Sequence, residues 1–278
     1  MKYLNEVWSS RELLFNLVSR EVRGKYKRTI FGQLWSLVNP LALMLIYTFV
    51  FGLIFRSNPP PGDPSGLDVF PLWLLCGLLP WIFFSTVVST SAGSLVANAG
   101  LIQKVAFSRI VLPLSTVGST AYNWAFEMAV LLIAIVVAGG FVWPWIPLLI
   151  VAMALLAVFA AGIGLLFSIF TVYFRDTQYL LGILLQFWIY LTPIIYPISL
   201  VSNESAKHGG LLGTPVTLLG IYDLNPMVHF VAIFRELIYD NRWPDPAEWL
   251  ICVIWAAAAA GFGMLVFRKN EPKLAEAL

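Results

Sequence analysis

The sequence predicts an all-α integral membrane protein, with six transmembrane helices in one domain spanning residues 1–278. Three observations support this class. Hydrophobic residues make up 59% of the chain and charged residues 12%, with a mean hydropathy of +0.82, whereas soluble domains are about half apolar and about a quarter charged. The apolar residues gather in long runs, and a run of roughly 20 spans a bilayer as a helix. Lysine and arginine lie mostly on one side of these runs.

Six apolar runs set the expected order of elements. We place the spans at residues 33–55, 70–92, 113–138, 147–172, 179–198 and 248–267. An amphipathic helix at the membrane surface precedes them within residues 1–32, and residues 268–278 form a tail. Within the long connection 199–247, the stretches 211–222 and 227–239 are too apolar for an exposed loop and too short to cross. We therefore expect re-entrant or interfacial helices on the extracytoplasmic side.

The basic residues predict the orientation. Thirteen of the 17 lysines and arginines lie in the N-terminal segment, the second-to-third and fourth-to-fifth connections, and the tail. The four others are Arg56, Lys207, Arg235 and Arg242. Cytoplasmic segments carry the excess of positive charge. We therefore expect both termini in the cytoplasm of a multi-pass inner-membrane protein.

The N-terminal segment combines apolar residues at helical spacing with a basic run, which is typical of a helix lying on the membrane surface. The five basic residues nearest the first span are Arg20, Arg23, Lys25, Lys27 and Arg28. In one interpretation these charges only hold the first span in place. In the other they also bind anionic lipid phosphates, including those of a lipid-linked substrate.

The connection between the second and third spans is short and unusually apolar. It contains Leu101, Ile102, Val105 and Phe107, with Asn98 before them, Lys104 among them and Pro113 after them. An exposed apolar patch of this kind indicates a protein partner. The alternative is a helix lying in the lipid interface.

Side chains within the spans offer candidates for lining a conduit. Small-residue stripes at Ala154, Ala157, Ala161 and Gly164, and at Ala256, Ala260 and Gly263, predict close helix packing. Deep aromatic residues could stack on sugar rings or simply pack; they are Tyr47, Phe51, Trp81, Phe84, Trp188 and Tyr190. Glu127 lies in the middle of a span with Asn123 one turn before it. A mid-span carboxyl normally faces a bundle interior or a wet cavity, so these two either line a conduit or stabilise packing.

Several motifs are missing from the sequence. It contains no phosphate-binding loop of the GxxxxGK[ST] form, no run of intramembrane acidic or basic residues for a proton relay, and no metal-ligand cluster or catalytic triad. We therefore expect no catalytic residue, metal or cofactor on this chain. An energy source for transport would have to be another polypeptide.

Four blocks, taken in order, resemble the type-2 ABC exporter permeases for O-antigen, capsule, teichoic acid and galactan. They are residues 28–40 (RTIFGQLWSLVNP), 101–113 (LIQKVAFSRIVLP), 173–197 (YFRD to YP), and 224–236 (LNPM to FRE). The resemblance implies that residues 98–107 form a coupling helix and that Arg175 and Asp176 lie at a second contact with the ATPase. It also implies a permease homodimer with two ATPase subunits that carry ATP and Mg²⁺. The expected substrate is a glycan on a polyprenyl pyrophosphate, and no nucleic acid is involved.

Three rival functions remain open at this point. A type-2 ABC permease for a drug or small lipid would share the fold. An integral-membrane glycosyl- or acyltransferase would need a cluster of acid, base or metal-binding residues, which the sequence lacks. A structural assembly factor would need no ATPase.

Overall fold

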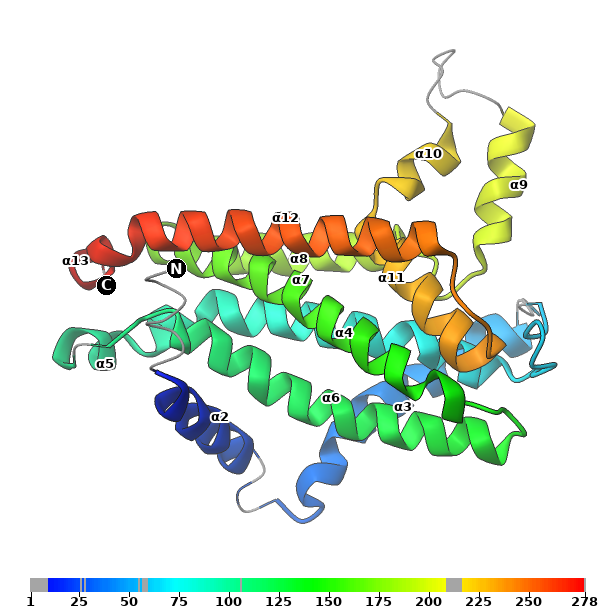
Figure 1. Cartoon of the computed structure of the whole chain (residues 1–278), viewed down its shortest axis with the longest axis horizontal. Helices are drawn as coiled ribbons and strands as arrows, with labels where there is room; N and C mark the ends of the chain where they lie inside the picture. The colour runs from blue at the N-terminus through cyan, green and yellow to red at the C-terminus, as the bar shows by residue number, and fades with distance from the viewer. Residues whose placement is uncertain are drawn as a thin grey trace.

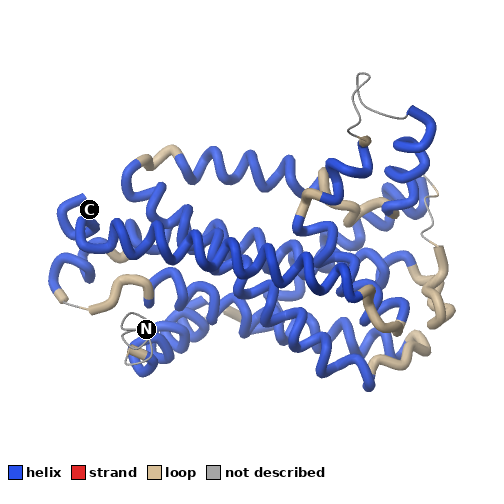
Figure 2. Tube along the Cα trace, turned by 45° about the horizontal axis from the view of Figure 1, so that its top comes forward, coloured by secondary structure: helices blue, strands red, loops and turns tan. Residues whose placement is uncertain are grey.

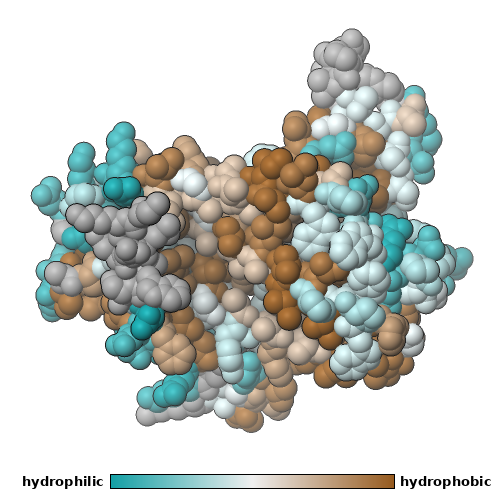
Figure 3. Space-filling view, in the orientation of Figure 1, coloured by the Kyte–Doolittle hydropathy of each residue, from teal (hydrophilic) through white to brown (hydrophobic). Residues whose placement is uncertain are grey.

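The computed structural model describes residues 10–25, 27, 29–54, 56, 60–105, 107–208 and 217–277. Helices and their connections account for these residues, with no β-strand among them (Figure 2). Five helical segments are long and apolar enough to cross a membrane. Hydrophobic residues cover the middle of the visible face and hydrophilic ones gather toward its two ends (Figure 3). The all-helical membrane class is therefore confirmed.

The elements follow one another in the order shown in Figure 1. They are α2 (Arg11–Lys25), η1 (Gly32–Leu34), α3 (Trp35–Tyr47), η2 (Thr48–Ile54), α4 (Phe70–Ala97), α5 (Ala99–Lys104), α6 (Val111–Val137), η3 (Trp143–Trp145), α7 (Ile146–Tyr173), α8 (Thr177–Tyr190), α9 (Ile198–His208), α10 (Leu218–Asp223), α11 (Pro226–Arg235), η5 (Glu236–Asp240), α12 (Pro246–Asn270), η6 (Glu271–Lys273) and α13 (Leu274–Ala277).

Five of the six predicted spans coincide with long helical segments, and the fifth does not. The predicted run 179–198 becomes α8, which has 14 residues and ends at Tyr190. At 1.5 Å per residue such a helix is about 21 Å long, against a hydrocarbon core of about 30 Å. Residues 191–196 form turns instead. The predicted stretch 227–239 is helical through α11 and η5. Within the predicted stretch 211–222, residues 211–216 lie outside the described residues and residues 218–222 belong to α10; α9 precedes that stretch.

Helix α4 forms the centre of the bundle, with buried side chains from Trp73 to Leu95. Helices α7 and α12 approach most closely at Gly162 and Gly263. A Cβ built on Gly162 would lie 2.3 Å from the Ala259 carbonyl carbon, and one on Gly263 would lie 2.1 Å from the Gly162 oxygen. Gly162 was not in the predicted stripe, and Ala154, which was, is exposed. The predicted α12 stripe therefore lies at this contact, with Ala256 buried and Gly263 closest to α7. In the predicted α7 stripe, Gly164 packs instead on α4, where a Cβ would lie 2.8 Å from Ser91, so that stripe does not mark the face toward α12.

The two ends of the bundle carry different elements (Figure 1). Helices α2, α5 and α13 lie at one end, and α9, α10 and the outer end of α11 lie at the other. A second apolar cluster joins the first end, where Leu17 of α2, Ile102 of α5 and Leu274 of α13 are buried together with residues of α7 and α12. The segments predicted to be cytoplasmic are therefore grouped at one end.

Candidate functional site

A polar cavity lies between α2, α3, α4 and α6. Its volume is about 380 Å³. Asn123 and Glu127 of α6 line it and are 5% and 8% exposed. The other lining residues are Lys25, Thr29, Trp35, Ser36, Asn39, Pro40, Ile82, Phe83, Thr86, Thr120 and Trp124. The structure therefore places the two predicted polar residues of the third span at one cavity.

The interface helix α2 is fixed to α6 by a carboxylate that the sequence did not single out. Ser115 donates a hydrogen bond of 3.0 Å to Glu21 Oε1, and Ser119 donates one of 2.7 Å to Oε2. Gly118 lies between these serines, and a Cβ built there would meet Val18 at 2.8 Å. The sequence could have indicated this contact, because two serines and a glycine lie along one face of the third predicted span.

The basic residues of the interface segment lie at the surface. Arg20, Arg23, Lys25 and Lys27 are exposed, and Lys25 also lines the polar cavity. Arg28 lies outside the described residues. Binding of lipid phosphates by this group therefore stays a prediction, with Lys25 the member that connects the surface to the cavity.

The predicted conduit aromatics do not form one surface. Trp81 and Phe84 are 4% and 0% exposed and belong to the core. Phe84 stacks on Phe159 with 5.4 Å between ring centroids and meets Trp188 edge-on at 5.1 Å. Packing within this chain accounts for the positions of these rings, and a glycan would reach them only if the core opened.

The remaining aromatic candidates lie nearer the surface of the chain. Tyr47 and Phe51 are partly buried on α3 and η2, with 6.3 Å between ring centroids. Tyr190 is 57% exposed at the end of α8. A conduit wall made of these side chains remains a prediction.

Helix α8 ends at Tyr190, and a side chain of α11 stabilises the irregular backbone that follows. Arg235 Nη1 donates a hydrogen bond of 2.6 Å to the Pro193 carbonyl, and Nη2 donates one of 2.7 Å to Ile194. The guanidinium lies 3.6 Å from the centroid of the Trp73 ring. Irregular backbone inside a membrane protein persists where other protein groups satisfy it. The sequence analysis counted Arg235 only as one of the extracytoplasmic charges. In the structure its guanidinium supplies hydrogen-bond donors for two backbone carbonyls beyond the end of α8.

Asn225, which lies between α10 and α11, also hydrogen-bonds the residues that follow α8. Its side-chain nitrogen donates to the Leu191 carbonyl and to Thr192 Oγ1, each at 3.0 Å. Its Oδ1 accepts from the Met227 backbone and from Trp188 Nε1, at 3.0 and 2.8 Å. Trp188, a predicted conduit residue, is therefore committed to this junction through its indole nitrogen.

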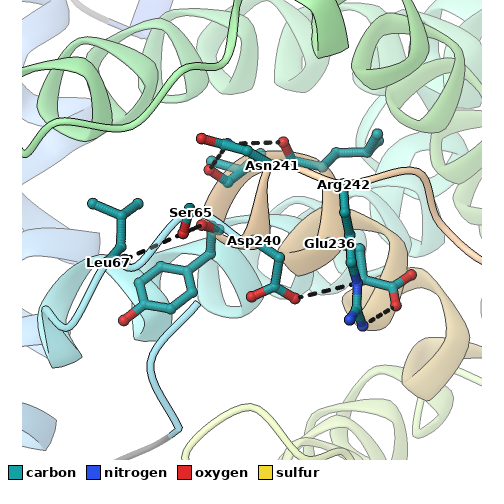
Figure 4. Close-up of polar contacts among 9 residues, drawn as sticks. Ser65, Leu67, Glu236, Asp240, Asn241 and Arg242 are labelled. Atoms are coloured by element: carbon teal, nitrogen blue, oxygen red, sulfur yellow. Dashed lines mark hydrogen bonds and ion pairs between the residues drawn. The ribbon is translucent and has the colours of Figure 1, made fainter. Parts of the chain in front are cut away.

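The proline- and glycine-rich turn 60–69, to which the sequence analysis assigned no role, contacts η5, the segment that follows α11 (Figure 4). Ser65 Oγ donates to the Tyr239 carbonyl at 2.6 Å, and Tyr239 Oη accepts from the Val69 backbone at 3.1 Å. Arg242 pairs with Glu236 at 2.5 Å beside Asp240. Burial raises the pKa of the Asp240 carboxyl, and the neighbouring Arg242 opposes that shift. The segment formed by α11 and η5, residues 226–240, is called the α11 hairpin below. It is thus bound to the turn that precedes α4 as well as to the residues that follow α8.

The predicted coupling segment is only partly exposed. Ile102 is 3% exposed and belongs to the apolar cluster with Leu17 and Leu274, so the expectation that it faces a partner is wrong. Leu101 and Phe107 pack partly against the same cluster, whereas Lys104 and Val105 are exposed and Asn98 is intermediate. The short α5 has one apolar face, and α13 covers it.

The second predicted contact lies on the turn between α7 and α8. Arg175 and Asp176 are exposed there, and the preceding Phe174 is 69% exposed. Helix α13 contacts both α5 and α7. Arg109, which follows the coupling segment, donates its backbone N–H to Glu271 Oε1 at 2.8 Å, and its guanidinium donates to the Glu271 carbonyl. The tail thereby links the loop after α5 to the end of α12.

The described residues contain no group of three or more His, Cys, Asp or Glu side chains arranged to hold a metal ion. Cys76 and Cys252 are free and buried.

Comparisons with known proteins identify the family. The model of the ABC-2 type transporter family matches residues 12–239, which include the polar cavity, α5 and the α11 hairpin. This chain belongs to the ABC-2 type transporter family. The resemblance deduced from the four sequence blocks is therefore confirmed at the level of the family.

Curated relatives of this ABC-2 chain align over nearly their whole length. It is 29% identical over 286 residues to the O-antigen export system permease protein RfbA of Myxococcus xanthus, covering 100% of both chains. It is 30% identical to a Klebsiella pneumoniae protein of the same name, covering 96% of this chain and 95% of the relative. The Escherichia coli polysialic acid transport protein KpsM is 27% identical, with 92% of each chain covered.

Proposed function

We propose that this chain is the membrane-spanning permease subunit of an ATP-driven exporter that carries a lipid-linked polysaccharide across the bacterial inner membrane. The observation that carries the proposal is the end-to-end similarity to permeases named for O-antigen export. Relatives named for polysialic acid and capsule polysaccharide support the same class of cargo.

A separate ATPase is part of the proposal. The sequence has no phosphate-binding loop, so ATP and Mg²⁺ belong to the partner subunit. Exposed Lys104 and Val105 on α5 and the turn at Phe174 to Asp176 are the surfaces that we assign to its docking. Both lie at the end of the bundle that also carries the basic helix α2 (Figure 1). The excess of positive charge there supports a cytoplasmic location for this end and for both termini.

A permease homodimer completes the proposed assembly. In the first span, Gly32–Ile54, only 6% of the most apolar window is buried within this chain, and α8 buries only Leu181 and Leu185. A second copy that covers part of these faces would enclose a conduit between two permeases. In this arrangement α8 is the shortened fifth of six spans, and α10 and α11 form a re-entrant hairpin on the extracytoplasmic side.

Depletion of the chain in its native host tests the transport function. The lipid-linked glycan should accumulate on the cytoplasmic face of the inner membrane while its synthesis continues, as measured by labelling with a membrane-impermeant sugar oxidant before and after cell lysis. An unchanged distribution of the glycan would contradict the proposal. Accumulation of a small lipid or drug instead would favour the rival ABC-2 cargo.

A further inference from the structure

We propose that the polar cavity between α2, α3, α4 and α6 is an intake site for the sugar nearest the phosphate of the lipid-linked cargo. This inference rests on the proposed function and adds a location, an orientation and a set of contacts to it. The cavity is lined by residues of a single chain.

The lining of the cavity matches an uncharged polyhydroxylated ligand. Hydroxyls of Ser36, Thr86 and Thr120 each donate and accept hydrogen bonds, and the amides of Asn39 and Asn123 do both through separate atoms. A sugar hydroxyl also donates and accepts, so neighbouring hydroxyls on one ring can satisfy such a mixed set. Ser36 and Asn123 each already donate one bond, to the Gln33 and Ser119 carbonyls, so a purely apolar ligand would be disfavoured most at the groups whose water it displaced.

A buried donor in the same wall lacks a partner within the described part of the chain. Trp124 is 2% exposed, and its Nε1 has no hydrogen-bond acceptor among those residues. The ring is fixed by stacking on Phe83, with 4.1 Å between centroids and planes 13° apart. Buried polar groups normally have a partner. This nitrogen exposes less than 1 Å², so a sugar oxygen would accept its hydrogen bond only after a neighbouring side chain moved.

The two charged residues give the ligand a direction. Lys25 lies on α2, one turn after Glu21, and Glu21 contacts α6 at Ser115 and Ser119. Glu127 lies eight residues beyond Ser119 along α6, which corresponds to about 12 Å of helix. The cavity thus has an ammonium group toward α2 and a carboxyl group farther along α6.

This separation of charge distinguishes the parts of the cargo. A phosphate is attracted to Lys25 and finds no opposite charge at Glu127. A sugar hydroxyl can hydrogen-bond the Glu127 carboxyl in either protonation state, because a hydroxyl both donates and accepts. The arrangement therefore favours a sugar beside Glu127 with its phosphate toward Lys25 and the basic surface of α2.

Binding by the complete permease–ATPase complex in phosphatidylethanolamine nanodiscs tests this site. The two probes are polyprenyl pyrophosphate and the same lipid carrying one N-acetylglucosamine, titrated separately and detected by native mass spectrometry. We expect the sugar-bearing probe to bind about tenfold more tightly than the bare carrier, since one additional set of hydrogen bonds of about 1.4 kcal/mol corresponds to that factor.

Two cavity variants and one control locate the preference. Glu127→Ala and Asn39→Ala change lining residues of two different helices, α6 and α3, and each should reduce the preference to less than about threefold while leaving affinity for the bare carrier unchanged. Thr90→Ala is the control, because Thr90 lines only the adjoining 280 Å³ cavity, and it should keep the full preference. If Glu127→Ala fails to assemble, Asn39→Ala on the more accessible α3 carries the test.

Equal affinity of the wild-type complex for the two probes would overturn the site, as would a preference that persists in both variants. Displacement of the sugar-bearing probe by phosphatidylglycerol at equal concentration would show an ordinary lipid headgroup site instead and would also overturn it. The depletion experiment separates this failure from that of the proposed function. If depletion causes glycan to accumulate but the sugar gives no preference, the chain is an exporter without this intake site.

Discussion

The two ends of the bundle differ in the partners of their polar side chains. At the end with α2, α5 and α13, an apolar cluster that includes Leu17, Ile102 and Leu274 is joined by side-chain hydrogen bonds to Glu21 and by the bonds between Arg109 and Glu271. At the opposite end, Arg235 and Asn225 donate hydrogen bonds to backbone carbonyls of the broken fifth span. Apolar contact is non-directional, whereas hydrogen bonds weaken steeply when their geometry changes. We infer that the inner end can shift under force from a partner, whereas the α11 hairpin keeps its position.

The largest effect is expected from a substitution that breaks the apolar contact at the end of the bundle with α2, α5 and α13. Ile102→Glu removes a buried aliphatic side chain and buries a carboxyl, and should destabilise the protein by about 4 kcal/mol. SDS-induced unfolding in mixed micelles measures this change. Val105→Glu is the matched control, because Val105 is 52% exposed. It should preserve stability while weakening co-purification with the ATPase, and a normal yield of complex would remove Val105 from the docking surface.

The next largest effect is expected from a substitution that breaks the polar contact at the opposite end of the bundle. Arg235→Met leaves the Pro193 and Ile194 carbonyls without their donors and should cost about 3 kcal/mol in the same unfolding assay. Arg242→Met makes the same change seven residues away, where the side chain is 44% exposed and pairs with Glu236. We expect a loss below about 1 kcal/mol there. Equal losses from the two substitutions would show that Arg235 does not stabilise the broken span.

A third substitution tests the bundle between the two ends. Gly162→Val forces α7 and α12 apart, because a Cβ on Gly162 already lies 2.3 Å from the Ala259 backbone. We expect a loss of about 2 kcal/mol from this overpacking. Gly261→Val has open space around the new side chain within this chain and should cost less than half as much. The midpoint of SDS unfolding compares them, and similar midpoints would contradict the close packing of α7 and α12.

The smallest expected effect sharpens the description of α2. Ser119→Ala removes the 2.7 Å hydrogen bond to Glu21 and should cost about 1 kcal/mol. The loss should be local, so amide exchange should accelerate in residues 11–25 and stay constant in 226–240. Ser202→Ala, on a hydroxyl that bonds only its own helix at Ser199, serves as the control. Faster exchange in both segments after Ser119→Ala would show that α2 is not a separable element.

The sequence predicts the helical class, five of the spans and the polar position of Glu127 because these depend on local composition. It does not predict that α8 ends at Tyr190, since the apolar run continues through residues 191–198. Arg235 and Asn225, more than 30 residues later, hydrogen-bond the backbone beyond the break, and Tyr196 donates to the Tyr190 carbonyl. Ile102 was misplaced for a similar reason. A short amphipathic helix shows that it has an apolar face, but not that α2, α12 and α13 of the same chain cover that face. The closest approach of α7 and α12 at Gly162 likewise depends on the rotation of two helices, which composition does not fix.

Hydrogen–deuterium exchange on the full permease–ATPase complex, with and without a non-hydrolysable ATP analogue, tests the distinction between the two ends most directly. The structure predicts a nucleotide-dependent change in α2 and α5, residues 11–25 and 99–104, together with unchanged protection of residues 226–240. A nucleotide-dependent change in 226–240 with constant exchange in α2 and α5 would contradict the account.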